Sequence, residues 1–275
     1  LIMNPRLSIS VVLYHPDLVL FQRVFHQMLV AYRHAEAHFS GLHLFLIDNG
    51  ESSDALAYVN SQKEHWSGCM SLEWISGQGN VGYGSAHNLA IDRTDSDLHL
   101  ILNPDVLIEK DAFTEAFRFF HDNPDAGLIA PFVSDGQGRL TYLCKRYPSL
   151  LVLLLRGFVP NVIRRLWQNR LDAYSMQDVI NDHDVYWDPP IVSGCFMFFR
   201  TTILKKLRGF DQRYFLYFED FDLSLRTSRI ARLVYVPSVR IVHFGGHTAT
   251  KGARHISLFM RSAVLFFNTH GWKLI

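Results

Sequence analysis

Residues 7–14 read LSISVVLY, and this stretch begins the pattern that decides the fold. It is rich in β-branched residues and stops at His15-Pro16, which is typical of a strand. Between Leu18 and Tyr32, apolar residues then recur at the three- and four-residue spacing of an amphipathic helix. Apolar runs at 42–47, 72–75 and 98–102 follow, with a glycine-rich turn and a helical pattern near 86–92 before the last of them. Alternation of this kind predicts an α/β layer with a mainly parallel sheet.

The second half of the chain is regular at its two ends only. A helix at 111–121 and a strand at 127–133 continue the pattern, and residues 136–190 then break it, although 150–171 suits helices lying on another surface. Strands at 194–199, 233–236 and 239–243 follow, with a helix closed by Arg208-Gly209 and another opening near Glu219-Asp220. We therefore divide the chain into an α/β half (1–135), a basic irregular insertion (136–190), a second regular part (191–250) and a C-terminal amphipathic segment (251–275).

Composition restricts the class of protein. With 275 residues, 48% apolar and 19% charged, the chain is long enough to bury a core without disulfides or structural metal, and intrinsic disorder is excluded. Cys69, Cys144 and Cys195 are odd in number and lack metal-ligand spacing, which favours a reducing cytoplasm. The longest apolar run, 150–155, is far shorter than the ~20 residues of a membrane-spanning helix, and residues 1–7 do not resemble a secretion signal. We expect a soluble protein, peripheral at most.

Charge is strongly segregated along the chain, although the net charge is only +1. Residues 136–171 contain seven Lys or Arg and no acid, and residues 223–275 contain eight and no acid. This distribution predicts a partner with several negative charges. The candidates are nucleic acid, a phosphorylated small molecule and an anionic membrane surface.

Three carboxylates, Glu219, Asp220 and Asp222, lie among five aromatic residues. Apolar surroundings and neighbouring like charges raise carboxyl pKa values, which suits a general base. Alternatively, the acids begin a helix and Asp222 pairs with Arg226 four residues on. Taken alone, the pattern favours the second interpretation.

Three strands end in side chains that suit ligand contacts. Asn103-Pro104-Asp105 follows the fourth strand, where open α/β sheets bind ligands, and an Asp there suits Mg²⁺ or Mn²⁺. Asp48 ends the second strand and suits a nucleobase contact, while His243 ends a later strand beside two glycines. Each is also compatible with an ordinary turn or a structural histidine.

Residues 77–82, GQGNVG, match the G-x-G-x-x-G spacing of dinucleotide-binding proteins. The preceding strand is short, so the match alone is weak. A plainer interpretation is that Gly82 and Gly84 let the backbone approach a ligand closely, while Asn80 and Asn88 supply amide contacts.

The order of these motifs along residues 7–250 resembles the family 2 glycosyltransferases with the GT-A fold. Within that family, the chain is most similar to bacterial rhamnosyltransferases that build surface polysaccharides. The resemblance rests on Asp48-Asn49-Gly50, Asn80-Val81-Gly82-Tyr83-Gly84 with Asn88, Leu102-Asn103-Pro104-Asp105, Ser193-Gly194, the segment 209–226 and His243.

The resemblance implies an inverting transfer of a sugar, rhamnose, from a dTDP- or UDP-linked donor. The acceptor would be a hydroxyl of a lipopolysaccharide or a lipid-linked glycan. Residues 1–135 would bind the nucleotide sugar, 136–190 would contact the acceptor or a membrane, and 191–250 would form the catalytic half.

The resemblance also implies a set of site residues. Asp220 is the general base with Glu219 beside it, and Asp105 and His243 hold Mg²⁺ or Mn²⁺. Asn103 replaces the first acid of the family's D-x-D, which leaves one fewer negative charge for the cation. The donor would contact Tyr14, Asp48, Asn80, Gly82, Gly84, Asn88, Asn103 and Asp105, and the acceptor Ser193, Gly194, Glu219 and Arg226.

Two other classes remain open from the sequence. An NAD(P)-dependent Rossmann oxidoreductase would explain residues 77–82 and Asp97, but it leaves Glu219, Asp220 and His243 without roles. A nucleic-acid-binding module would explain the basic stretches, but no recognised motif accompanies them, so we expect no nucleic acid partner. We predict a cytoplasmic protein, at most peripheral on the inner face of the cytoplasmic membrane.

Overall fold

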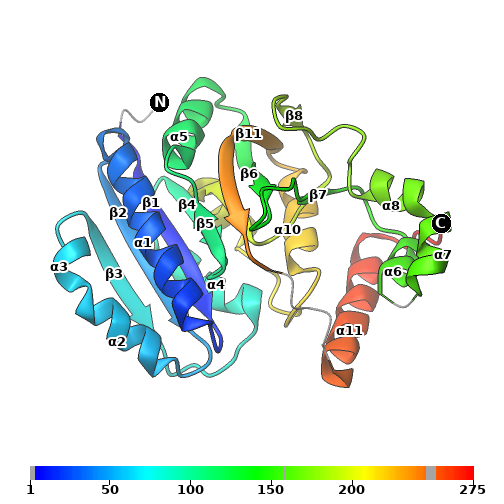
Figure 1. Cartoon of the computed structure of the whole chain (residues 1–275), viewed down its shortest axis with the longest axis horizontal. Coiled ribbons are helices and arrows are strands. Elements are labelled where there is room, and N and C mark those ends of the chain that lie inside the picture. The colour runs from blue at the N-terminus through cyan, green and yellow to red at the C-terminus, as the bar shows by residue number, and fades with distance from the viewer. Residues whose placement is uncertain (1–3, 158, 246–251) are drawn as a thin grey trace.

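The computed structural model of the chain describes residues 4–157, 159–245 and 252–275. Within these residues, nine strands form one sheet in the order β3-β2-β1-β4-β10-β6-β11-β5, with β8 also paired to β11 (Figure 1). A separate two-stranded sheet joins β7 to β9. The strands are β1 (Arg6–Leu13), β2 (Gly41–Asp48), β3 (Met70–Ile75), β4 (Leu98–Leu102), β5 (Val106–Ile108), β6 (Ala126–Ser134), β7 (Cys144–Lys145), β8 (Tyr186–Trp187), β9 (Ile191–Val192), β10 (Phe196–Arg200) and β11 (Arg232–His243).

The sheet is mixed but mostly parallel, as predicted. β3, β2, β1 and β4 run parallel to one another, and β11 runs parallel to β6. β10 is antiparallel to both of its neighbours, β4 and β6, and β5 is antiparallel to β11. The carboxyl ends of β1, β4 and β11 therefore lie at the same edge of the sheet.

Helices cover both faces of the sheet. α1 and α5 pack on one face, while α4, α9 and α10 contact one another on the other. The helices are α1 (Leu18–Ala35), η1 (Glu36–His38), α2 (Ser53–Ser61), α3 (Lys63–Trp66), α4 (Tyr83–Arg93), α5 (Ala112–Asp122), α6 (Leu150–Gly157), α7 (Asn161–Leu166), α8 (Gln168–Tyr174), α9 (Thr201–Leu207), α10 (Glu219–Thr227) and α11 (Ala253–His270). Among the described residues, no helix is both long and apolar enough to cross a bilayer.

Two expectations about local structure need correction. The predicted strands 233–236 and 239–243 form one strand, β11, whose register shifts between Val236 and Arg240. Pro237 has no N–H to donate, so the ladder is interrupted there without the strand ending. The insertion predicted to be irregular (136–190) contains two short strands, β7 and β8, in addition to α6, α7 and α8, which agree with the helical pattern at 150–171. The four-part division of the chain stays a prediction, and residues 246–251 lie outside the described residues.

A buried polar network lies beneath α4 at the centre of the sheet. Ser8 and Ser10 of β1 hold the two ring nitrogens of His99 at 2.6 and 2.9 Å, and Ser10 also contacts His87 Nδ1 at 2.7 Å. Burial lowers the pKa of His99 to about 3 and holds the pKa of His87 well below its usual range. Both imidazoles are therefore neutral at physiological pH.

Candidate functional site

A cavity of about 760 Å³ lies beyond the carboxyl ends of the parallel strands. This is the position at which open α/β sheets bind ligands. Its walls come from the end of β1, the loop before α4, the loop after β4, the loop before α10, the end of β11 and the first turns of α11. Five of the eight predicted donor residues line it: Tyr14, Asn80, Gly82, Asn103 and Asp105.

Asp105 and His243 meet at the edge of this cavity. β5 pairs with β11 so that Val106 lies opposite His243, and Phe244 N donates to the carbonyl oxygen of Asp105 at 3.0 Å. His243 Nε2 consequently lies 3.4 Å from Asp105 Oδ1. A Cβ on Gly245 would lie 2.4 Å from that same Nε2, so the chain has no room for a side chain here.

Neighbouring groups raise the pKa of His243. Burial alone would lower the pKa of His243, but the Asp105 carboxylate and the Cys195 thiol raise it to about 10. Asp105 Oδ1 is buried, and the described residues give it no hydrogen bond of good geometry. A divalent cation held by both side chains would therefore have to displace the proton that this pair holds.

Glu219 and Asp220 begin α10 after two strained residues. Tyr217 and Phe218 have φ values of 70° and 65°, a conformation that costs energy for residues with a Cβ. Phe218 is held by aromatic packing against Phe221, Phe259 and Phe266. The packing of α11 on α10 therefore supports the backbone that presents the two carboxylates.

The two carboxylates differ in their partners. Asp220 Oδ2 accepts a hydrogen bond from Gly194 N at 2.8 Å, and its Oδ1 accepts one from Phe221 N at 2.9 Å. Glu219 is buried, and among the described residues its Oε2 has no hydrogen-bond partner. Burial raises the pKa of both groups, the charge of Asp220 raises that of Glu219 further, and the N–H groups on Asp220 oppose its rise.

Tyr83 connects the acidic pair to the end of β4. Its hydroxyl lies 2.7 Å from the carbonyl oxygen of Gly194 and 2.9 Å from Asn103 Oδ1. Burial holds the pKa of Tyr83 well above its usual range, and the charges of Glu219, Asp220 and Asp105 add to this effect. Tyr83 and Asp105 line the cavity, whereas Glu219, Asp220 and His243 are not among the described lining residues and lie behind them.

Three of the predicted donor residues do not line the cavity. The Asp48 carboxylate accepts from Gly50 N at 3.0 Å and Ser52 N at 2.7 Å, so it closes the turn that places Asn49 in the cavity wall. Asn88 makes two hydrogen bonds of 2.8 Å with the backbone of Phe210. A Cβ on Gly84 would lie 2.8 Å from Phe210 Cβ, so this glycine permits close packing of α4 on that loop.

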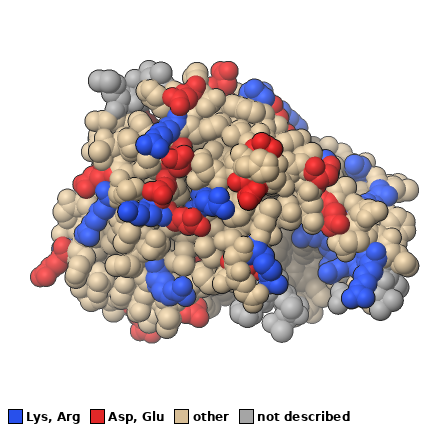
Figure 2. Space-filling view, turned by 45° about the horizontal axis from the view of Figure 1, so that its top comes forward, with Lys and Arg blue, Asp and Glu red and all other residues tan. Residues whose placement is uncertain are grey.

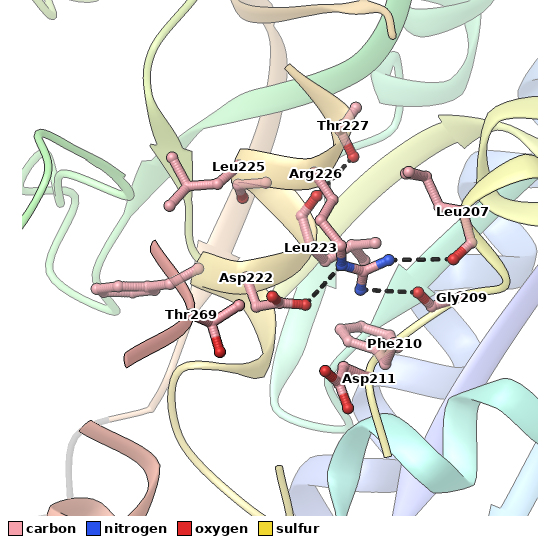
Figure 3. A network of polar contacts seen from close by, with 12 residues as sticks. Leu207, Gly209, Phe210, Asp211, Asp222, Leu223, Leu225, Arg226, Thr227 and Thr269 are labelled. Atoms are coloured by element: carbon pink, nitrogen blue, oxygen red, sulfur yellow. Dashed lines mark hydrogen bonds and ion pairs between the residues drawn. The ribbon is translucent and has the colours of Figure 1, made fainter. Parts of the chain in front are cut away.

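Some of the predicted acceptor residues lie near Asp220, and Arg226 instead bonds groups inside the fold. Gly194 contacts Asp220 and Tyr83 as described, and Ser193 precedes it, with its N–H donating to Leu143 O at 3.1 Å. The Arg226 guanidinium instead reaches into the fold (Figure 3), where it donates to Asp222 Oδ2 at 2.7 Å, Gly209 O at 2.9 Å and Leu207 O at 3.1 Å. An acceptor contact by Arg226 stays a prediction that these hydrogen bonds do not support.

Several residues of the site escape the sequence analysis. Arg23 of α1 and Arg254 of α11 bring positive charge to the cavity wall from helices distant in sequence. Lys145 of β7 is largely buried; desolvation lowers its pKa to about 8, although the charge of Asp220 acts against that shift. Only Tyr83 has a local signal, since it stands inside the Asn80–Gly84 motif at the start of a helix.

Comparison with known proteins identifies the family. The model described as "Glycosyl transferase family 2" matches residues 21–208, which is more than half of the chain. The chain belongs to glycosyl transferase family 2. This membership agrees with the resemblance in the sequence, and it argues against the oxidoreductase alternative.

Two curated relatives of this family 2 chain are rhamnosyltransferases. One, the N-acetylglucosaminyl-diphospho-decaprenol L-rhamnosyltransferase of Mycobacterium tuberculosis, is 28% identical over 211 residues, covering 70% of this chain and 66% of that protein. The chain thus spans slightly less than two thirds of that relative's length. Rhamnosyltransferase WbbL of Escherichia coli is 28% identical over 193 residues, covering 67% of each chain.

A solved structure supports the predicted fold. The mannosyltransferase PcManGT from Pyrobaculum calidifontis, in complex with GDP-Man and Mn²⁺, superposes with a TM-score of 0.60 at 16% identity. The superposition covers 90% of this chain and 59% of that one. The likeness confirms the GT-A type of fold, with its mixed, mostly parallel sheet flanked by helices.

Proposed function

We propose that this family 2 glycosyltransferase moves rhamnose, with inversion, from a dTDP- or UDP-linked donor to a hydroxyl of a lipopolysaccharide or lipid-linked glycan. One observation carries the proposal. Tyr83 of the cavity wall contacts both Asn103 and Gly194, whose N–H binds Asp220, and Asp105 of the same wall lies beside His243. The choice of rhamnose is supported by the names of both relatives, and that of a lipid-linked acceptor by the name of the mycobacterial one.

The donor occupies the cavity in this proposal. Tyr14, Asn80, Gly82, Asn103 and Asp105 contact it, because these five residues line the wall. Arg23 and Arg254 add positive charge that stabilises a diphosphate. We give Asp48, Gly84 and Asn88 positioning roles, since their contacts hold the turns that form the wall.

Asp105 and His243 are the residues that would hold Mg²⁺ or Mn²⁺. The described residues contain no group of three or more His, Cys, Asp or Glu side chains in metal-binding geometry, so the donor phosphates would supply further ligands. A bound cation would stabilise the negative charge that develops on the departing nucleoside diphosphate. The Mn²⁺ in the mannosyltransferase complex supports this assignment.

Asp220 takes the proton from the attacking hydroxyl. Asp220 is half-buried, whereas Glu219 is only 5% exposed, so Asp220 is the carboxylate that an acceptor reaches. Two backbone N–H groups favour its charged form, while burial raises its pKa toward that of a useful base. Gly194 N donates to Asp220, and the proposed acceptor contacts are Ser193, Gly194 and Glu219.

A screen for thermal stabilisation tests the proposal. The purified chain is incubated with dTDP-rhamnose, UDP-sugars, GDP-mannose and NADH, each with and without Mn²⁺ or Mg²⁺. We expect stabilisation by a dTDP- or UDP-sugar that increases with the cation, followed by transfer of labelled sugar to a lipid-linked acceptor. Saturable NADH binding without nucleotide-sugar binding would overturn the proposal.

The proposed place of action is the cytoplasmic side of the membrane.

A further inference from the structure

α11 presents apolar side chains on two sides. Phe266 and Phe267 pack into the fold together with Ala263. On the exposed side, Ile256, Met260 and Val264 follow one another at four-residue spacing and are 46%, 48% and 44% exposed. Residues four apart on a helix lie on the same face, so these three form a continuous apolar row. An apolar row on a solvent-facing helix indicates an interaction surface.

Elements that adjoin α11 expose further apolar side chains. The backbone N–H groups of Leu150 and Leu151 donate to the carbonyls of Lys273 and Leu274 at 2.9 and 3.2 Å, which joins α6 to the residues after α11. We call α6, α7, Trp167, α8, α11 and residues 271–275 the helical appendage, which gathers at one end of the molecule in Figure 1. It exposes further large apolar side chains: Leu154, Leu166, Trp167, Trp272, Leu274 and Ile275.

The charge of the helical appendage is almost entirely positive. Its elements contain seven Lys or Arg residues, and Asp172 of α8 is their one acidic residue. Arg164 and Arg165 lie next to Leu166 and Trp167 and are exposed like them. Blue side chains accordingly gather toward the lower right of Figure 2.

We infer that the helical appendage is a docking surface for an anionic lipid bilayer. Apolar and tryptophan side chains enter the headgroup boundary, while Arg and Lys contact lipid phosphates. A second copy of the chain fits less well, because a two-fold contact would bring the same positive charges together. The apolar row also lies on the helix whose first turns line the cavity through Arg254, His255 and Leu258. Docking would place the cavity beside the bilayer, and its use for a lipid-linked acceptor rests on the proposed function.

Vesicle sedimentation tests the docking surface without donor or acceptor. We expect the chain to sediment with phosphatidylcholine vesicles containing one third phosphatidylglycerol, weakly with phosphatidylcholine alone, and less as salt rises. The variant Ile256→Ser/Met260→Ser/Val264→Ser should bind at least about tenfold more weakly. Val185→Ser/Ile230→Ser, which changes exposed apolar residues elsewhere, should bind like the wild type.

A second test variant, with its own control variant, addresses the basic residues of the helical appendage. Arg164→Gln/Arg165→Gln should lower binding to the anionic vesicles roughly tenfold or more, and Lys63→Gln/Lys110→Gln, exposed cations on other elements, should not. Equal binding by the wild type and both docking-surface variants, with melting temperatures unchanged, would overturn the inference. A concentration-dependent dimer that the triple variant abolishes would assign the surface to a second copy instead. Because the triple variant changes no proposed donor residue, its nucleotide-sugar binding separates failure of docking from failure of the proposed function.

Discussion

Replacing Arg226 with methionine tests the role that the structure gives this residue. Arg226 pairs with Asp222, whose side chain is 1% exposed and also accepts from His270 Nε2 at 2.8 Å. The change leaves a buried carboxylate with one partner in place of two. It also removes the donors to Gly209 O and Leu207 O.

The expected loss follows from these contacts. Breaking a buried ion pair from one side costs about 3–5 kcal/mol, because the remaining charge stays desolvated. At roughly 2 °C per kcal/mol for a chain of this size, the melting temperature should fall by roughly 6–10 °C. The double variant Asp222→Asn/Arg226→Met removes the stranded charge and should therefore lose less stability than Arg226→Met alone.

Urea unfolding followed by tryptophan fluorescence gives the comparison, with Arg229→Met as the control. Arg229 lies on the exposed surface just after α10. A loss below about 1 kcal/mol for Arg226→Met, matching that of the control, would refute the reasoning. A raised KM for the acceptor at unchanged stability would instead support the acceptor contact that the family resemblance implies.

Three further predictions concern the core and the cavity. The pKa of His99 is about 3 in the folded chain and 6.5 in the unfolded chain, so the unfolded chain takes up the proton first as the pH falls. The free energy of unfolding should therefore fall by about 1.4 kcal/mol per pH unit from pH 6.5 toward 3. His99→Gln should show a shallower decline of the urea midpoint between pH 7 and 5, and an equal decline would contradict this. Asp105→Asn should remove the gain in donor affinity that Mn²⁺ provides, by roughly tenfold or more, beyond any change in affinity measured in EDTA. Calorimetry of His243→Gln should show the same loss of the Mn²⁺ effect with affinity in EDTA unchanged. An undiminished Mn²⁺ effect in both variants would exclude a cation there. Gly82 has φ = 90°, and a Cβ there would lie 2.4 Å from Phe215 O, so Gly82→Ala should lower the melting temperature and weaken donor binding together, whereas an unchanged melting curve would show that the turn tolerates a side chain.

Sequence patterns predict the sheet well, because the spacing of apolar residues and the residues that end a strand are local properties of the sequence. The apolar runs at 7–14, 42–47 and 98–102 correspond to β1, β2 and β4, and the strand ends that follow them approach one cavity. The convergence of Asp105 with His243 depends on the long-range pairing of β5 with β11. That pairing was not predictable, since β5 is three residues long and lies only three residues after β4.

Residue roles were harder to predict than residue positions. Asn88 and Arg226 carry polar groups at places where the family resemblance implies ligand contacts, yet their hydrogen bonds satisfy backbone groups of the loop at 207–210. Such assignments depend on where a loop far along the chain returns, which no local pattern specifies. Arg23 and Arg254 reach the cavity wall from surface helices for the same reason.

Donor affinity and transfer rate of Asp220→Asn, measured side by side with the wild type, test the central claim most directly. The substitution keeps the shape of the side chain and leaves an oxygen to accept from Gly194 N, but it removes the proton acceptor. We predict donor affinity within about twofold of the wild type and turnover lowered by roughly 10²–10⁴. Wild-type turnover in this variant would contradict the account and move the base to another residue, Glu219 first.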